Sequence, residues 1–160
     1  MSEGAKATIT RGDAWTAADL GPIASIKDYR FLHEPSGLKA RGKVFGAELL
    51  GAKGLEISWN TLPPGAAVPF AHSHRQNEEL YLFLSGTGEM LLDGAIQPVR
   101  EGSMVRVEPK VARAWRNVGA DVLVFLVIQY RADSEIPLGI KDGAYLGPAA
   151  WPLAQQIDSK

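Results

Sequence analysis

The chain of 160 residues carries 17 basic and 18 acidic side chains, has a formal net charge of −1 and contains no cysteine. Its length suits one domain that buries its own core. Because neither sign of charge forms a block, we expect neither nucleic acid nor an anionic membrane surface as a partner. Without cysteine there are no disulfides or thiolate sites, so any metal must be held by imidazole and carboxylate groups.

Residues 1–23 are predicted to form a loosely held N-terminal arm with one short helical turn near residues 16–20. They lack the charged-then-apolar pattern of a signal peptide. The longest apolar run, at 122–128, is far too short to span a bilayer. These features predict a cytoplasmic protein without a membrane partner.

Residues 24–131 form short segments rich in β-branched, aromatic and leucine residues, separated by turn-forming residues and without a sustained helical period. This pattern predicts an all-β sandwich or barrel. The expected strands lie at 24–32, 43–50, 55–62, 68–74, 79–86, 88–94, 103–108, 112–118 and 121–130. Among the turns between them, residues 51–54 are predicted to form a tight hairpin and Asp93-Gly94 a two-residue turn.

Two histidines lie one residue apart in the expected strand at 68–74. Side chains alternate along a strand, so His72 and His74 are predicted to point the same way, about 7 Å apart. Glu79 opens the next strand and can place a carboxylate beside them. Two imidazoles and one carboxylate suit divalent iron, manganese, nickel or zinc. The remaining histidine, His33, is expected at a solvated strand end.

Residues 65–86 resemble the first motif of the cupin superfamily in residue type and in spacing. The matching positions, in the order G-x6-HxH-x4-E-x6-G, are Gly65, His72, His74, Glu79 and Gly86. The resemblance implies a jelly-roll β-barrel, a metal and a small-molecule ligand held inside it, and a homodimer. The apolar segments at 79–84 and 122–128 also favour a dimer, since one small barrel does not easily cover them.

Residues 102–117 resemble the second cupin motif, which Gly102 opens and Asn117 closes at the expected spacing. The proline, glycine and metal-binding histidine of that motif are replaced here, in that order, by Glu108, Lys110 and Arg113. The histidine that supplies the fourth metal ligand in the family is therefore missing. The strand pattern places the barrel at residues 24–131, of which the resemblance covers roughly 55–130, and residues 132–160 are expected to form an extension that packs on it.

Arg113 changes the chemistry of the expected site. It cannot lose its proton or coordinate a cation, but its planar guanidinium binds carboxylates and phosphates. A divalent ion about 5 Å away would be repelled by roughly 7 kcal/mol at an effective dielectric constant near 20. Either Arg113 points at the substrate and a three-ligand metal survives, or it pairs with Glu79 and takes the place of the metal. The retention of both imidazoles favours the first outcome, because a pair formed by Arg113 and Glu79 alone would not require any histidine.

Two functions follow from this pattern. The preferred one is metal-assisted processing of a small polar or anionic molecule, and the resemblance implies an oxygenase or an isomerase or epimerase. The alternative is a metal-free, non-catalytic barrel that binds small molecules, with Arg113 in place of the metal. The candidate metal ligands are His72, His74 and Glu79, and the candidate substrate-binding residues are Arg113, Tyr81 and Trp115.

Overall fold

The computed structural model describes residues 6–33, 38–134, 144, 146 and 148, and these residues form mostly β-strands. The strands, in chain order, are β1 (Thr8–Arg11), β2 (Thr16–Asp19), β3 (Arg30–His33), β4 (Leu38–Arg41), β5 (Lys43–Phe45), β6 (Glu56–Leu62), β7 (Asn77–Ser85), β8 (Thr87–Leu92), β9 (Ala95–Arg100), β10 (Met104–Val107), β11 (Arg113–Asn117) and β12 (Leu123–Arg131). Two short helices, the 3-10 helix η1 (Ile23–Asp28) and α1 (Ala47–Leu50), precede β3 and β6.

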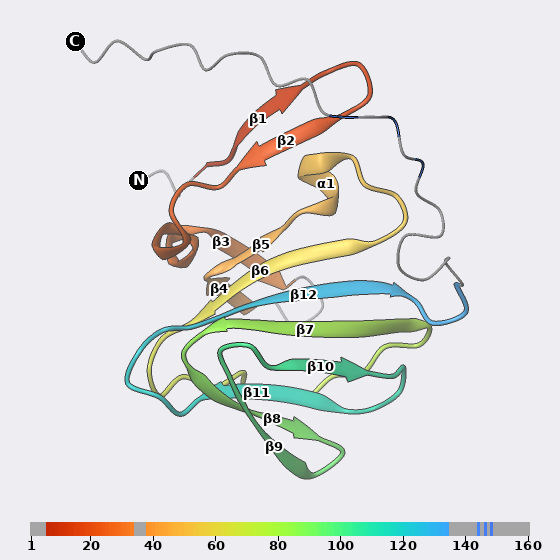
Figure 1. Cartoon of the computed structure of the whole chain (residues 1–160). Helices are drawn as coiled ribbons and strands as arrows, with labels where there is room; N and C mark the ends of the chain where they lie inside the picture. Colours follow the sequence, from red (N-terminus) through yellow and green to blue (C-terminus); the bar gives the residue numbers. More distant parts are fainter. Residues whose placement is uncertain (1–5, 34–37, 135–143, 145, 147, 149–160) are drawn as a thin grey trace, which may run out of the picture.

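Two antiparallel sheets build the body of the protein (Figure 1). The larger sheet has the strand order β10-β7-β12-β6-β5, and the smaller sheet has the order β11-β8-β9. Neighbouring strands such as β7 and β12 are distant in the sequence, which is typical of a jelly roll. The all-β jelly-roll prediction is therefore confirmed.

The main core lies between these two sheets. Strand β7 alternates so that Tyr81 and Phe83 face inward, where both are buried, while the leucines that alternate with them are only half-buried. Each large apolar side chain that is fully buried stabilises the fold by about 1.5–3 kcal/mol. The buried members of this core are Tyr81, Phe83, Met90, Val99, Val107, Leu123, Phe125 and Val127.

The two predicted turns have different outcomes. Asp93 and Gly94 join β8 to β9 with φ angles of 47° and 88°, as the two-residue hairpin turn requires. The tight hairpin predicted at 51–54 is wrong, because residues 47–50 form α1 rather than the end of a strand. Gly51 ends this helix in the left-handed conformation, with a φ angle of 70°.

The N-terminal prediction needs correction. The helical turn expected near residues 16–20 is wrong, because Thr16–Asp19 is strand β2, paired with β1. Helix η1 occupies most of the strand expected at 24–32. Ile26 and Tyr29, from η1 and the residue after it, pack against Trp59 of β6 and cover one part of the larger sheet.

The extension at the C-terminus and the dimer stay predictions. Most of the extension expected at 132–160 lies outside the described residues. The outer face of β7 and β12 carries half-buried leucines such as Leu82 and Leu126, and its pairing with a second copy of the chain stays a prediction. In the part of the chain that the structure describes, no helix is both long and apolar enough to cross a membrane.

Asn117, which closes the second motif, ties together two loops at one end of the barrel. It is buried, and its amide donates to the carbonyl oxygens of Leu62 and Asp121 at 2.8 Å each, while its oxygen accepts from the Gly119 amide. Asn117→Ala is expected to lower the free energy of unfolding in urea by about 2–3 kcal/mol, because the three hydrogen bonds of this buried side chain are lost. The exposed neighbour Arg116 provides the control, since Arg116→Ala should cost less than about 1 kcal/mol. Equal losses in the two variants would contradict this role.

Candidate functional site

The two histidines are positioned by backbone pairing with β11. The segment expected to be a strand at 68–74 is not a regular strand, and Pro69 offers no amide for a continuous ladder. His72 nevertheless forms an isolated bridge with Arg113, through reciprocal hydrogen bonds of 3.0 and 2.9 Å. The Lys110 amide donates to the His74 carbonyl oxygen at 2.9 Å. These bonds hold both histidines against the smaller sheet.

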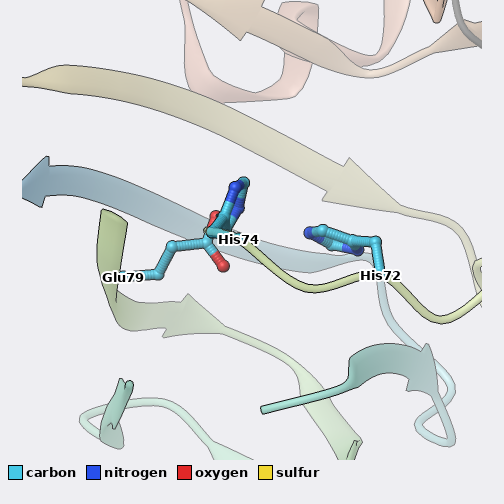
Figure 2. Close-up of side chains that lie close together, drawn as sticks. All are labelled: His72, His74 and Glu79. Atoms are coloured by element: carbon cyan, nitrogen blue, oxygen red, sulfur yellow. The ribbon is translucent and has the colours of Figure 1, made fainter. Parts of the chain in front are cut away.

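Glu79 on β7 meets the histidines from the larger sheet (Figure 2). One ligand atom from each of His72, His74 and Glu79 lies within 4.8 Å of the others. His74 Nε2 lies 3.0 Å from Glu79 Oε1, and the two imidazole centroids are 5.3 Å apart. The structure therefore brings together the three residues that the sequence selected as candidate ligands.

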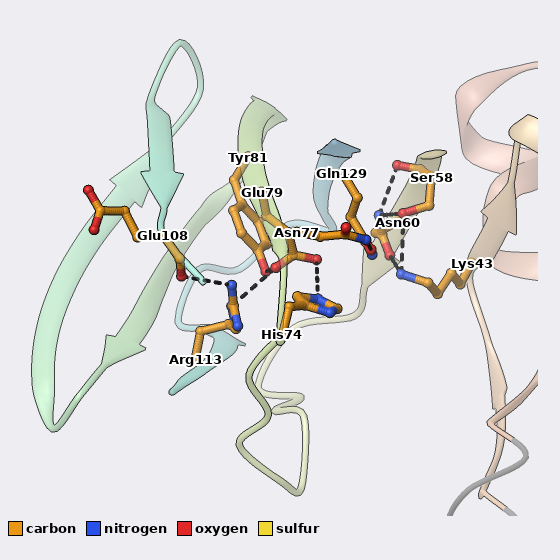
Figure 3. A network of polar contacts seen from close by, with 10 residues as sticks. All are labelled: Lys43, Ser58, Asn60, His74, Asn77, Glu79, Tyr81, Glu108, Arg113 and Gln129. Carbon is orange, nitrogen blue, oxygen red and sulfur yellow. Dashed lines mark hydrogen bonds and ion pairs between the residues drawn. The ribbon is translucent and has the colours of Figure 1, made fainter. Parts of the chain in front are cut away.

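Arg113 lies on the other side of Glu79 (Figure 3). Its side chain is fully buried, and its Nε lies 3.1 Å from Glu79 Oε2. The Tyr81 hydroxyl donates to the same oxygen at 2.6 Å, and Arg113 Nη2 donates to the Glu108 carbonyl oxygen at 3.4 Å. Arg113 thus pairs with one carboxylate oxygen, while His74 lies beside the other oxygen and His72 stays within the cluster. This arrangement combines elements of the two outcomes expected from the sequence.

The charges around Glu79 keep it ionised. Burial alone raises the pKa of Glu79, but the contacts with His74 and Tyr81 outweigh burial and hold the pKa below its ordinary value. Burial, followed by the neighbouring Glu79 charge, raises the pKa of Tyr81 well above its ordinary value, so the phenol stays a donor. Burial lowers the pKa of His72 to about 4, which leaves the imidazole neutral at pH 7.

Aromatic rings form the wall beside the cluster. The ring of Trp115 lies 5.7 Å from that of His72 and 5.6 Å from that of Tyr81, measured between centroids. Trp115 also packs edge-on against Phe125 of the core. Arg113, Trp115 and Asn117 share the inner face of β11, as the alternation of the strand predicts. Substrate contacts by Arg113, Tyr81 and Trp115 stay predictions.

Three polar residues in the same interior were missed from the sequence. Lys43 on β5 donates to Ser58 Oγ at 3.2 Å and to Asn60 Oδ1 at 2.8 Å, and both acceptors are buried on β6. Asn60 is paired with Phe125 of the core, so all three side chains face the space between the sheets. The signal was the alternation of Ser58 and Asn60 with the apolar Ile57 and Trp59 along β6.

Comparison with known proteins identifies the family. A family model described as a cupin domain matches residues 58–129. The crystal structure of a cupin protein from Bacteroides fragilis is 38% identical, with a TM-score of 0.60 over 64% of this chain and 87% of that chain. This chain belongs to the cupin superfamily. The fold and the two motifs predicted from the sequence are thereby accounted for by one relationship.

Two further relatives are more distant. An uncharacterized protein of Methanocaldococcus jannaschii is 31% identical over 67 residues, which are 42% of this chain. The match spans about half (54%) of that relative's length. A candidate sugar phosphate isomerase of Acidithiobacillus ferrooxidans has a crystal structure that is 27% identical, with a TM-score of 0.51 over 57% of this chain and 59% of that chain.

The side chains of the cluster fit the metal that cupins often bind. Among the described residues, His72 Nδ1 and His74 Nε2 are buried without a hydrogen-bond partner, although His74 Nε2 lies near Glu79. Unpartnered polar atoms are costly to bury, and a metal ion would satisfy both nitrogens. Arg113 and Tyr81 bind only Oε2 of Glu79, which leaves Oε1 facing His74. Such supporting contacts orient metal-binding carboxylates in proteins.

Proposed function

We propose that this cupin binds a divalent transition metal and isomerises or epimerises a small anionic molecule. His72, His74 and Glu79 would hold the ion, and iron, manganese, nickel and zinc all suit two imidazoles and one carboxylate. The observation that carries the proposal is the meeting of three ligand atoms within 4.8 Å inside the barrel, where His72 Nδ1 is buried without a hydrogen-bond partner among the described residues.

The roles of the surrounding residues follow from their contacts. When bound, the ion supplies Lewis-acid polarisation of a substrate oxygen. Arg113 and Tyr81 hold the Glu79 carboxylate in one orientation through Oε2. Arg113 Nη1 is buried without a partner among the described residues, so it can donate to an anionic oxygen of the substrate. Trp115 would form the wall against which the substrate lies.

The reaction class rests on a family relative and on charge. The relative described as a candidate sugar phosphate isomerase is 27% identical to this chain. A phosphorylated sugar offers both an anionic group for a guanidinium and vicinal oxygens for a metal ion. These two properties favour isomerisation or epimerisation over oxygenation.

Deuterium exchange tests this activity directly. Aldose and ketose phosphates would be incubated in D2O with the manganese-loaded protein and followed by proton NMR. Interconversion, with deuterium appearing at the carbon next to the carbonyl, is expected for native protein and for Ser73→Ala, an exposed residue between the histidines. His72→Ala should lower the rate by about 100-fold or more, because it removes a ligand. No conversion by protein that carries one ion per chain would contradict the proposal.

A second function is supported by a different observation. Arg113 Nε lies 3.1 Å from Glu79 Oε2, which is the pairing expected of a barrel that binds ligands without a metal. In that case chelator-treated protein would bind the same sugar phosphates as tightly as manganese-loaded protein, and neither form would convert them.

A further inference from the structure

Lys43 enters the barrel from the side opposite to Arg113. Strand β5, which carries Lys43, is at the edge of the larger sheet, whereas Arg113 is in the smaller sheet. Glu79 and His74 lie between the two cations (Figure 3). Lys43 as a whole is half-buried, at the border between the interior and solvent.

The two carboxylates whose charges affect the pKa of Lys43 form their contacts with other residues. These are Glu79 and Glu56, and no ion pair joins Lys43 to either within the described part of the chain. Glu79 contacts His74, Tyr81 and Arg113, as described above. Glu56 Oε1 accepts hydrogen bonds from the amides of Gly46 and Ala47 at the start of α1. Among the described residues, the hydrogen-bond acceptors of Lys43 are therefore neutral.

The two acceptors leave part of the ammonium group available. A lysine ammonium has three donors, and Ser58 and Asn60 account for two of them. The ammonium also lies 4.8 Å from the ring centroid of Phe45. Burial lowers the pKa of Lys43 to about 8, with the Glu79 and Glu56 charges opposing the shift, so the amine is still mainly protonated at pH 7.

The charges of the interior do not balance. Glu79 supplies one negative charge, Arg113 pairs with it, and Lys43 adds a further positive charge that no carboxylate pairs with in the part of the chain that the structure describes. A divalent ion at the cluster would increase the excess. Unpaired charge is costly to bury, so a ligand that brings negative charge to this side of the barrel would be favoured.

We propose that Lys43 binds an anionic group of the ligand, with Ser58 and Asn60 as positioning residues that aim its ammonium into the barrel. The inference rests on the proposed function, because it defines the ligand class of the same site. With Lys43 and Arg113 on opposite sides of the cluster, that class is a small molecule with negatively charged groups at both ends, such as a sugar bisphosphate or a phosphorylated sugar acid.

Calorimetric titration with inorganic phosphate tests the assignment on chelator-treated protein, so that no metal contributes. Lys43→Met keeps the length of the side chain and removes its charge, and Lys53→Met, at an exposed loop residue, is the matched control. The dissociation constant for phosphate is expected to rise about tenfold or more in Lys43→Met and to stay within about twofold in Lys53→Met. Binding of Mn²⁺ should stay within about threefold of native in Lys43→Met, because the ligand set is untouched.

The urea midpoint separates a binding role from a structural one. If Lys43 serves only to bind the ligand, the urea midpoint of Lys43→Met is expected to equal or exceed that of the native protein. The reason is that the substitution removes a partly buried charge. A lower midpoint together with weaker phosphate binding would assign Lys43 to the fold and overturn the proposal. Equal phosphate affinity in native and Lys43→Met protein would overturn it too, as would the absence of phosphate binding to native protein. Failure of native protein to bind Mn²⁺ would instead refute the metal-dependent function.

Discussion

Glu79→Gln is expected to weaken binding of Mn²⁺ by about 100-fold or more, because it replaces the one carboxylate of the cluster with a neutral amide. The oxygen that faces His74 would lose its charge, and the ion would be left with two imidazoles and the repulsion of Arg113. Calorimetric titration of chelator-treated protein measures the change.

Glu78 provides the matched control for this substitution. It is the preceding residue on β7, it points to the opposite face, and it is buried against Arg106 and Tyr130, with which it forms hydrogen bonds. Glu78→Gln therefore removes an equally well-partnered carboxylate outside the barrel, and it is expected to change Mn²⁺ affinity by less than about threefold. Similar losses of affinity in Glu78→Gln and Glu79→Gln would show that the effect comes from general damage to β7.

Arg113→Met is expected to lower the free energy of unfolding of the metal-free protein by about 3–5 kcal/mol, because it leaves the Glu79 carboxylate buried without its cation. Glu79→Gln should lower the free energy of unfolding by a similar amount, since it leaves the Arg113 guanidinium buried without its anion. The double variant is expected to lose about 1–3 kcal/mol less than the sum of the single variants. Urea denaturation of the four proteins measures this coupling, and strict additivity would mean that the pair contributes nothing to the fold.

The strands that could be predicted are those whose apolar alternation faces the core. The expected ranges of six strands agree with the structure to within two residues at each end, and these are β6, β7, β8, β10, β11 and β12. β9 was missed because Pro98 interrupts its pattern, and the structure tolerates this proline because β9 is at the edge of the smaller sheet. A helical turn was expected near residues 16–20, but pairing of Thr16–Asp19 with β1 outweighs local preference there.

The site was predictable to the extent that its residues fall within the two motifs. Spacing identified the histidines, Glu79 and the replacement at Arg113, and strand alternation placed the arginine inside the barrel. Pairing of Arg113 with Glu79 was one of the two outcomes expected from the sequence, but the choice between them depends on how the two sheets face each other, which the sequence does not show. Lys43 was missed for a related reason, since only the pairing of β5 with β6 brings it toward the ligand cluster.

The metal content of native protein, purified without a histidine tag or chelator, tests the central claim most directly. We expect native protein to carry close to one ion of iron, nickel, manganese or zinc per chain. The His72→Ala, His74→Ala double variant is expected to carry less than about a tenth of that amount. The Arg113→His variant, which restores the fourth ligand of the family motif, should carry at least as much metal as the native protein. Metal in Arg113→His alone, with none in native protein even after incubation with these ions, would contradict the claim and leave a barrel that binds anions without a metal.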